Sequence, residues 1–195
     1  MIHPDTRLRW ISDRIGYGVF ATRRIPKGTV TWTLDQFDRF YTPKQAKALP
    51  KAYRAILDKY GYRNADGQFI LCWDFGRYLN HSCEANCLGL GIDMEIAIRD
   101  IKAGEQMTSE YGTLNLVKDL RCRCGAPHCR KIIRTDDMLR YGDVWDAKVE
   151  DALPASRRMR QPLSPFFKDP GWFTPVSTGR LPLPAHKGYW HKARR

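Results

Sequence analysis

Three cysteines fall within eight residues of this sequence, at Cys122, Cys124 and Cys129. Gly125 and Pro127 lie between them and favour the sharp turns that let three thiolates face one point. Such a cluster with turn residues is typical of a structural zinc site rather than of three unrelated buried thiols. It predicts that residues 122–129 fold around a zinc ion.

A structural zinc site is normally tetrahedral with four protein ligands, so a fourth ligand has to come from elsewhere. His128 directly precedes Cys129, and its side chain would tend to point away from the site that Cys129 faces. Cys72 lies in the apolar run of residues 69–73, which favours a place in the core. A cysteine from the 80s is geometrically easier, but spacing alone leaves four candidates open, namely His128, Cys83, Cys87 and Cys72.

The 195 residues are 43% hydrophobic and 12% aromatic, which is enough to bury the core of one compact domain with an extension. Much of the chain consists of short β-type segments broken by Gly and Pro, such as residues 18–22, 29–33 and 94–98. A helix is expected after Thr42, an N-cap followed by Pro43, with Pro50 dividing it. We therefore expect a mostly β fold with short helices.

Two stretches share the pattern A-x-R-x-I-x-x-G, at residues 21–28 and 97–104. Each is typical of a strand, a glycine turn and a return strand. Because stacked repeats need about three copies to bury a continuous core, two copies do not predict a solenoid. We expect two similar hairpins within one domain.

The formal net charge is +12, and residues 151–195 contribute +7 of it through nine Lys/Arg and two Asp/Glu. A basic surface favours an anionic partner such as nucleic acid or a nucleic-acid-associated protein. The same segment holds seven of the twelve prolines, which favours extended, irregular chain. Its aromatic residues would be costly to expose, so we expect it to wrap the domain or meet a partner; they are Phe166, Phe167, Trp172, Phe173, Tyr189 and Trp190.

No stretch reaches the ~18 consecutive apolar residues of a membrane-spanning helix. The first ten residues, MIHPDTRLRW, lack the apolar run of a secretory signal. We therefore expect no membrane contact and an intracellular location, cytoplasmic in a prokaryote and nuclear or chromosomal in a eukaryote.

Three further segments concentrate polar side chains or glycine. Residues 78–86 present a dense run of groups that donate, accept or ligate, and alone would favour a hydrogen-bonded turn. Residues 104–112 deliver Tyr111 beside a glycine, where a packed aromatic is the simpler interpretation. Residues 14–21 contain a G-x-G that permits close backbone approach to a ligand but also suits a simple turn, since no helix-forming segment follows.

Together and in this order, the motifs resemble the SET-domain protein lysine methyltransferases over roughly residues 9–134. The most specific part is Asn80-His81-Ser82-Cys83, followed by Glu110-Tyr111 and by the Cys-x-Cys-x4-Cys-Arg run, which resembles the family's post-SET zinc motif. The resemblance implies a SET-like fold of small curved sheets. It places a SET domain at residues 1–118, a zinc-bound post-SET segment at 119–134 and a basic, irregular C-terminal extension at 135–195.

The family's site can be carried over residue by residue. Tyr111 matches the catalytic tyrosine. Cys83 is implied as the zinc ligand that joins Cys122, Cys124 and Cys129. S-adenosylmethionine would be held by Gly16, Tyr17, Gly18, Tyr78, Asn80, His81, Tyr111 and Ile133. Further tyrosines would line the channel for the substrate lysine, with Tyr41, Tyr60, Tyr62 and Tyr78 available.

The sequence departs from the family pattern where Ala85 replaces a proline, where Glu110 replaces an aspartate, and in having no cysteine-rich segment before the domain. The last departure removes a clue to histone specificity. The activity implied is S-adenosylmethionine-dependent methyl transfer to a lysine of a histone or another basic protein, including nucleic-acid-associated ones. Two alternatives stay open: a non-catalytic, zinc-stabilised module that binds nucleic acid or chromatin, and a degenerate SET fold that binds cofactor without turnover.

Overall fold

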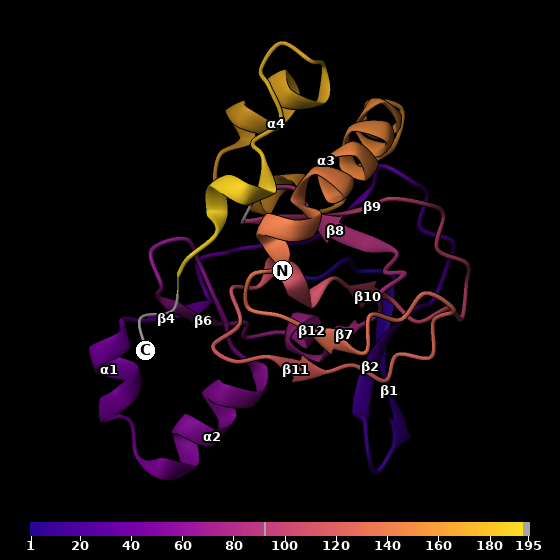
Figure 1. Cartoon of the computed structure of the whole chain (residues 1–195). Coiled ribbons are helices and arrows are strands. Elements are labelled where there is room, and N and C mark those ends of the chain that lie inside the picture. Colours follow the sequence, from indigo (N-terminus) through magenta and orange to yellow (C-terminus); the bar gives the residue numbers. More distant parts are fainter. Residues whose placement is uncertain (92, 193–195) are drawn as a thin grey trace.

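The computed structural model describes residues 1–91 and 93–192, and Figure 1 shows small sheets joined by loops and short helices. Two sheets have three strands, in the orders β3-β9-β8 (Val30–Thr33, Met94–Ala97, Cys87–Gly89) and β4-β6-β5 (Arg39–Tyr41, Phe69–Leu71, Tyr62–Arg63). The others are strand pairs: antiparallel β1–β2 (Thr6–Ser12, Gly16–Ala21), parallel β7–β10 (Asn80–His81, Thr108–Ser109) and antiparallel β11–β12 (Leu120–Arg121, Ile132–Ile133). The prediction of a mostly β, SET-like fold with short helices is confirmed.

The two A-x-R-x-I-x-x-G stretches pair with each other. The backbone N–H groups of Ile25 and Ile101 each donate to the other's carbonyl at 2.9 Å. Gly28 and Gly104, both at positive φ, donate in the same reciprocal way to Ala97 and Ala21 at 2.8 Å. The expectation of two separate hairpins is therefore wrong, because the strands flanking residues 21–28 pair elsewhere, β2 with β1 and β3 with β9.

The helix after Thr42 is confirmed. The Thr42 side chain accepts a hydrogen bond from the Gln45 N–H, and Oε1 of Gln45 accepts one from the Thr42 N–H, which completes a capping box. Pro50 divides the segment into α1 (Pro43–Ala48) and α2 (Lys51–Tyr60). Leu57 of α2 is buried, and the helix delivers Tyr60 to the region described below.

The C-terminal extension is largely helical. It contains α3 (Asp137–Ser156), η3 (Ser164–Phe166), α4 (Pro170–Ser177) and η4 (His186–Tyr189), so the expectation of extended, irregular chain is wrong over these elements. Prolines did not prevent this, because Pro165 and Pro170 stand in the first turn of their helices, where the missing N–H is not needed. Figure 1 shows α3 and α4, in orange and gold, on the side of β8 and β9 away from α1 and α2.

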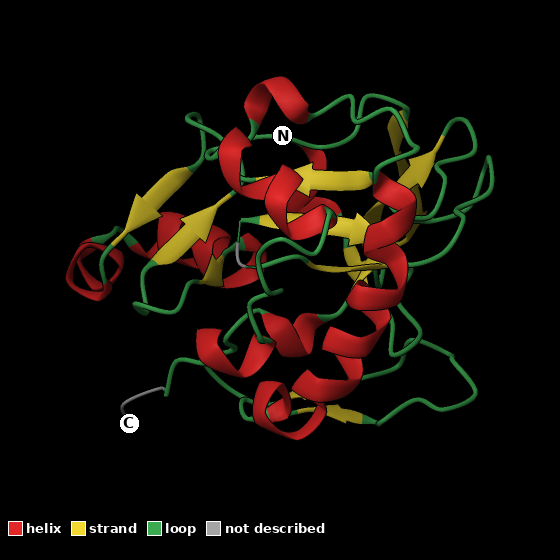
Figure 2. Cartoon of the chain, turned by 90° about the horizontal axis from the view of Figure 1, so that it is seen from above, coloured by secondary structure: helices red, strands yellow, loops and turns green. Residues whose placement is uncertain are grey.

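The extension completes one of two hydrophobic clusters. Seen from above in Figure 2, its helices lie across the strands, and Trp145, Val149 and Phe173 pack with Leu88 and Ile96 of the β3-β9-β8 sheet. The wrapping alternative is thus confirmed for this segment. The other cluster, which includes Val19, Ile25, Ile101 and Met107, lies under the β1–β2 hairpin and the paired repeats. Among the described residues, no helix is both long and apolar enough to cross a membrane.

Candidate active site

Tyr111 begins the 3₁₀ turn η2 (Tyr111–Thr113), two residues after strand β10 ends. Its hydroxyl donates to the Leu79 carbonyl at 2.7 Å, and its backbone N–H donates to Nδ1 of His81 at 3.2 Å. Strand β7 runs parallel to β10, with Asn80 opposite Thr108. The fold thereby places Tyr111 directly beside the predicted Asn-His pair.

Both aromatic groups at this junction are neutral at physiological pH. Burial, and then the nearby Glu95 carboxylate, raise the pKa of Tyr111 to about 12, so the phenol keeps its proton. Burial, and then the charge of Arg130, lower the pKa of His81 to about 4. Because Nδ1 of His81 accepts from Tyr111, its Nε2 carries the hydrogen, and that atom lies 3.4 Å from Sγ of Cys83.

Asn80 connects β7 to β2. Its side-chain amide donates to the Tyr17 carbonyl at 3.0 Å. A Cβ on Gly18 would lie 2.6 Å from Cδ1 of Ile11 and 3.0 Å from Nδ2 of Asn80, so a larger residue there would displace these side chains. Gly16 turns the chain at φ +81°, a conformation that favours glycine. The predicted G-x-G and Asn80 are therefore in contact.

Glu110 is buried beneath this junction. Its Oε1 accepts from the Gly112 N–H at 2.8 Å and from the Arg130 guanidinium at 2.5 Å. Arg130 also lies 3.6 Å from Asp137 at the start of α3 and stacks over Trp145, with 5.7 Å to the ring centroid. Burial raises the pKa of Glu110, although the arginine opposes that shift. One guanidinium thus joins the tyrosine turn, the cysteine segment and the extension.

The four predicted sulfur ligands gather at one place. Sγ of Cys122 lies 3.8 Å from Sγ of Cys83 and 3.6 Å from Sγ of Cys129. Zn–S bonds of about 2.3 Å in a tetrahedron put sulfur atoms about 3.8 Å apart, so these separations suit zinc. The Cys83 N–H points at Sγ of Cys124 at 3.5 Å, which brings the fourth sulfur to the group.

A second donor set overlaps this one. His81, Cys83, Cys122 and Cys124 offer ligand atoms that all lie within 4.8 Å of one another. We favour Cys129 over His81 as the fourth ligand, because Nδ1 of His81 is engaged by Tyr111 while Sγ of Cys129 lies 3.6 Å from that of Cys122. His128 has a 92% exposed side chain beside Glu84, and Cys72 and Cys87 lie in the core.

The remaining predicted residues divide between two places. The Tyr78 ring bridges Tyr17 and Tyr60, with ring centroids 5.8 Å and 5.3 Å away. Ile133 is buried in β12 opposite Leu120. Of the tyrosines expected to line a lysine channel, Tyr60 and Tyr62 line the cavity described next, whereas Tyr41 and Tyr78 do not.

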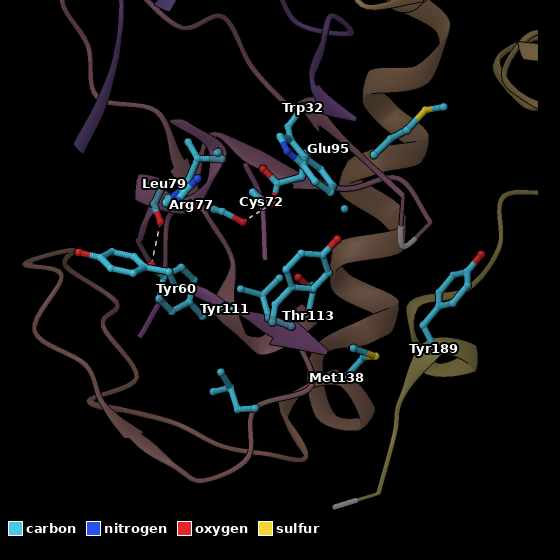
Figure 3. Close-up of a pocket in the computed structure, with 18 of the residues that line it drawn as sticks. Trp32, Tyr60, Cys72, Arg77, Leu79, Glu95, Tyr111, Thr113, Met138 and Tyr189 are labelled. Atoms are coloured by element: carbon cyan, nitrogen blue, oxygen red, sulfur yellow. Dashed lines mark hydrogen bonds between the residues drawn. The ribbon is translucent and has the colours of Figure 1, made fainter. Parts of the chain in front are cut away.

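A cavity of about 160 Å³ lies beside Tyr111, and Figure 3 shows the side chains around it. Its lining includes Leu79, Tyr60, Tyr62 and Trp32, which makes much of the wall apolar or aromatic. The predicted cofactor residues Gly16, Tyr17, Gly18, Asn80 and His81 are not part of this lining. Tyr111 and the Leu79 carbonyl therefore separate two environments.

Sequence reasoning missed the charged residues of the cavity, which are Asp58, Lys59, Arg77 and Glu95. Glu95 lies in β9, is 8% exposed and faces the same cavity as Tyr111. Its Oε1 accepts a hydrogen bond from the Ser109 hydroxyl. A signal existed, because Glu95 is the one charged residue in the otherwise apolar segment of residues 94–98, where a buried strand was predicted.

Comparison with known proteins gives one family match, since residues 16–112 match the SET domain model. The chain is 30% identical over 125 residues to the H3 lysine-4-specific histone-lysine N-methyltransferase of Schizosaccharomyces pombe, covering 58% of this chain and 13% of that protein. It is 31% identical over 140 residues to the histone-lysine N-methyltransferase ash1 of Drosophila melanogaster, covering 64% and 6%.

A third relative is the histone-lysine N-methyltransferase Su(var)3-9 of Drosophila pseudoobscura pseudoobscura, 26% identical over 152 residues, with 63% of this chain and 24% of that protein covered. The chain thus spans less than a quarter of the length of each of these relatives. The matched region begins at the glycine turn of Gly16 and ends at Gly112, just after Tyr111. The hydrogen bonds of Asn80 to Tyr17 and of Tyr111 to Leu79 and His81 lie within this matched region, and they agree with the family match: this chain contains a SET domain.

Proposed function

We propose that this protein transfers a methyl group from S-adenosylmethionine to the side-chain amine of a protein lysine. One observation carries the proposal. The Tyr111 hydroxyl is held at the Leu79 carbonyl, between the Asn80–Tyr17 contact on one flank and a cavity rich in aromatic residues on the other. A sulfonium donor and an amine acceptor need such a pair of neighbouring sites that meet at one point.

When bound, S-adenosylmethionine supplies an electrophilic methyl group. We assign its binding to residues on the β1–β2 hairpin side of Tyr111, where Gly18 lets the side chains of Ile11 and Asn80 approach the backbone and the Asn80 amide joins two strands. The residues proposed to hold it are Gly16, Tyr17, Gly18, Tyr78, Asn80, His81, Tyr111 and Ile133. His81 would act through its backbone and ring packing rather than by ionising, since its pKa is lowered to about 4.

Tyr111 is proposed as the catalytic residue. Its neutral hydroxyl is fixed by the Leu79 carbonyl, so its oxygen can face the transferring carbon with little reorganisation. The reaction is an in-line displacement and needs the two reacting atoms held near van der Waals contact. The aromatic cavity beside Tyr111 would orient the lysine and disfavour its ammonium form.

We propose a structural zinc ion held by Cys83, Cys122, Cys124 and Cys129. The donor chemistry fits, because thiolate sulfur is a usual zinc ligand and Sγ of Cys122 lies 3.8 Å from that of Cys83 and 3.6 Å from that of Cys129. Cys83 follows Asn80 and His81 closely, and Cys129 precedes Arg130. Zinc binding would therefore tie both motif segments to the site.

The substrate class is proposed from charge and relatives. The relatives named above are histone-lysine methyltransferases, and a histone or another basic protein is the substrate we propose here. A protein of net charge +12 would repel a lysine-rich tail, so recruitment through nucleic acid bound to the substrate is easier to justify than direct docking. Such a substrate would place the protein at nucleic acid inside the cell.

We propose that three segments of the chain have different roles. Residues 1–118 would carry the SET chemistry, residues 119–134 the zinc-bound post-SET segment, and residues 135–195 the basic extension that covers the β3-β9-β8 sheet. In this division, Arg130 and Asp137 connect all three parts.

Isothermal titration with S-adenosylmethionine, together with a tritiated-methyl assay on histones and other basic proteins, tests the proposal. We expect binding and labelled lysine. Binding without any label would favour a degenerate SET fold. Neither binding nor label, with retained affinity for nucleic acid, would favour the non-catalytic module.

A further inference from the structure

The cavity beside Tyr111 contains a carboxyl oxygen without a partner. Glu95 is more than nine-tenths buried, and only its Oε1 is engaged, by the Ser109 hydroxyl. Its Oε2 has no hydrogen-bond partner, and no described cationic side chain forms an ion pair with Glu95. A buried carboxylate normally costs several kcal/mol unless it is paired, so an unpaired one that faces a cavity indicates a ligand.

Other polar atoms on the same wall are also unpaired. They are Nε1 of Trp32, the hydroxyl of Tyr62 and Nε2 of His186, all belonging to residues that line the cavity. Figure 3 shows Trp32 close to Glu95, with Tyr111 and Tyr60 further along the lining. A carboxylate surrounded by aromatic rings is the combination that receives an organic ammonium group.

No described cationic side chain forms an ion pair with Glu95, although Lys59 and Arg77 line the same cavity. The ionisable groups that feel its charge are Tyr62, Cys72, Cys87 and Tyr111, and all four have raised pKa values and are neutral at pH 7. Asp58 lines the cavity as well, and neither Lys59 nor Arg77 is among the ion-pair partners of Glu95, so a direct positive partner for Oε2 has to come from a ligand. Burial raises the pKa of Glu95 to about 7, against an ordinary value near 4.5, although the Ser109 bond opposes that shift.

We propose that Oε2 of Glu95 binds the substrate's ammonium group and accepts its proton, an inference that rests on the proposed methyl transfer. One N–H bond of the ammonium breaks, the electron pair stays on nitrogen, and an O–H bond forms on Glu95. The amine is then neutral and nucleophilic beside Tyr111. After transfer, the carboxyl group returns the proton to water. Ser109 positions the carboxyl group by holding Oε1.

Raised basicity makes the carboxylate suitable for this task. A carboxylate with pKa near 7 takes a proton from an ammonium far more readily than an ordinary one. The pKa of a lysine ammonium is about 10.4 in water, and an aromatic cavity lowers it. The difference between the pKa of the ammonium and that of Glu95 therefore becomes smaller. Tyr111 cannot serve as this base, because its own pKa is about 12 and its proton is donated to Leu79.

The test compares Glu95→Gln with Glu150→Gln, an exposed glutamate on α3 that makes the same chemical change away from the cavity. We expect Glu95→Gln to lower kcat at pH 7 by about 10-fold to 100-fold, with unchanged S-adenosylmethionine affinity and no loss of Tm. The deficit should shrink as pH rises toward the pKa of lysine, because water then deprotonates the amine. Glu150→Gln should match the wild type.

A binding measurement keeps the inference testable without turnover. n-Butylamine, which mimics the lysine side chain, should raise the Tm of the wild type and of Glu150→Gln but not that of Glu95→Gln. Equal kcat in Glu95→Gln and wild type, or equal stabilisation by n-butylamine, would overturn the role of Glu95 alone. A wild-type protein that methylates no lysine but is stabilised by n-butylamine through Glu95 would refute the proposed function and the proton transfer while retaining the amine site.

Discussion

The two flanks of Tyr111 differ in how their polar groups are satisfied. One side, the motif flank, contains the Asn-His pair and Glu110. There the Asn80 amide, the His81 ring and the Glu110 carboxylate all have hydrogen-bond partners within the chain. On the cavity flank, Oε2 of Glu95 and the hydroxyl of Tyr62 are buried without any. Tyr111 takes part in both flanks, because it contacts His81 and also lines the cavity.

Both carboxylate oxygens of Asp137 also have no hydrogen-bond partner, but Asp137 lies 3.6 Å from Arg130, whereas no described cation forms an ion pair with Glu95. We attribute the paired charges to the fold and the unpaired Glu95 to the proposed ligand. A paired buried charge, such as Glu110 with Arg130, becomes costly when one partner is removed. An unpaired buried carboxylate, such as Glu95, already reduces the free energy of unfolding of the wild-type protein. Substitutions on the motif flank should therefore reduce stability, whereas those on the cavity flank should reduce turnover.

The sulfur cluster should give the largest effect on stability. A structural zinc ion contributes about 10 kcal/mol or more of apparent binding free energy in small zinc domains. We expect Cys83→Ser and Cys129→Ser to lose bound zinc and to lower Tm sharply, because each removes a sulfur that lies close to Sγ of Cys122, at 3.8 Å for Cys83 and 3.6 Å for Cys129. Metal analysis and thermal unfolding with and without chelator measure this.

Two substitutions serve as comparisons for the zinc experiment. Cys72→Ala changes a buried cysteine in the core and should keep one zinc per chain. His81→Gln tests whether His81 or Cys129 is the fourth ligand. Full zinc content in that variant agrees with Cys129. Loss of zinc in His81→Gln and its retention in Cys129→Ser would reverse our assignment.

Arg130→Met should destabilise the protein by about 3–5 kcal/mol, because it leaves Glu110 buried without its cation. Chemical denaturation measures the change. The double variant with Glu110→Gln should recover part of the loss. Arg24→Met removes an exposed pair with Asp100 and should cost less than about 1 kcal/mol. Equal losses in the two single variants would show that the Arg130 contact is not structural.

Tyr111 lies between the two flanks, and the substitution Tyr111→Phe tests its hydroxyl. It removes only the hydroxyl that donates to Leu79, so we expect S-adenosylmethionine affinity to remain measurable while methyl transfer falls by about 100-fold or more. Calorimetry and single-turnover labelling separate the two effects. Near-normal rates in this variant would refute the catalytic role of the hydroxyl.

The basic extension should give the smallest effect. Residues 151–195 supply core side chains such as Phe173 and Val176, so deleting them would test folding rather than binding. Replacing the exposed Arg157, Arg158 and Arg160 by Gln leaves the core intact. If these residues contact phosphates, the plot of log binding constant against log salt concentration should become less steep, by up to about 0.9 per lost contact. The same change at Lys44, Lys47 and Lys51 on the opposite side is the matched comparison, and an unchanged slope in the arginine variant would exclude that surface.

The sequence predicted local features well where short-range chemistry decides them. The cap at Thr42 and the break at Pro50 follow from neighbouring residues, and both are present. The extension was harder, because its seven prolines suggested extended chain. Pro165 and Pro170 stand in first turns, which permits helices, and the helices α3 and α4 also contain Pro154 and Pro175. The two repeats were recognised, but their mutual pairing through Ile25 and Ile101 depends on long-range contacts that no local pattern encodes.

The sequence alone determined which groups could do chemistry, since cysteine spacing, the Asn-His pair and Tyr111 are fixed by residue order. Only the tertiary structure decided which of them meet, by aligning β7 with β10 and by bringing Arg130 to Glu110. It alone also revealed Glu95 as an unpaired carboxylate. Burial and hydrogen-bond satisfaction are properties of surroundings assembled from distant segments, and a residue's own neighbours in the chain do not specify them.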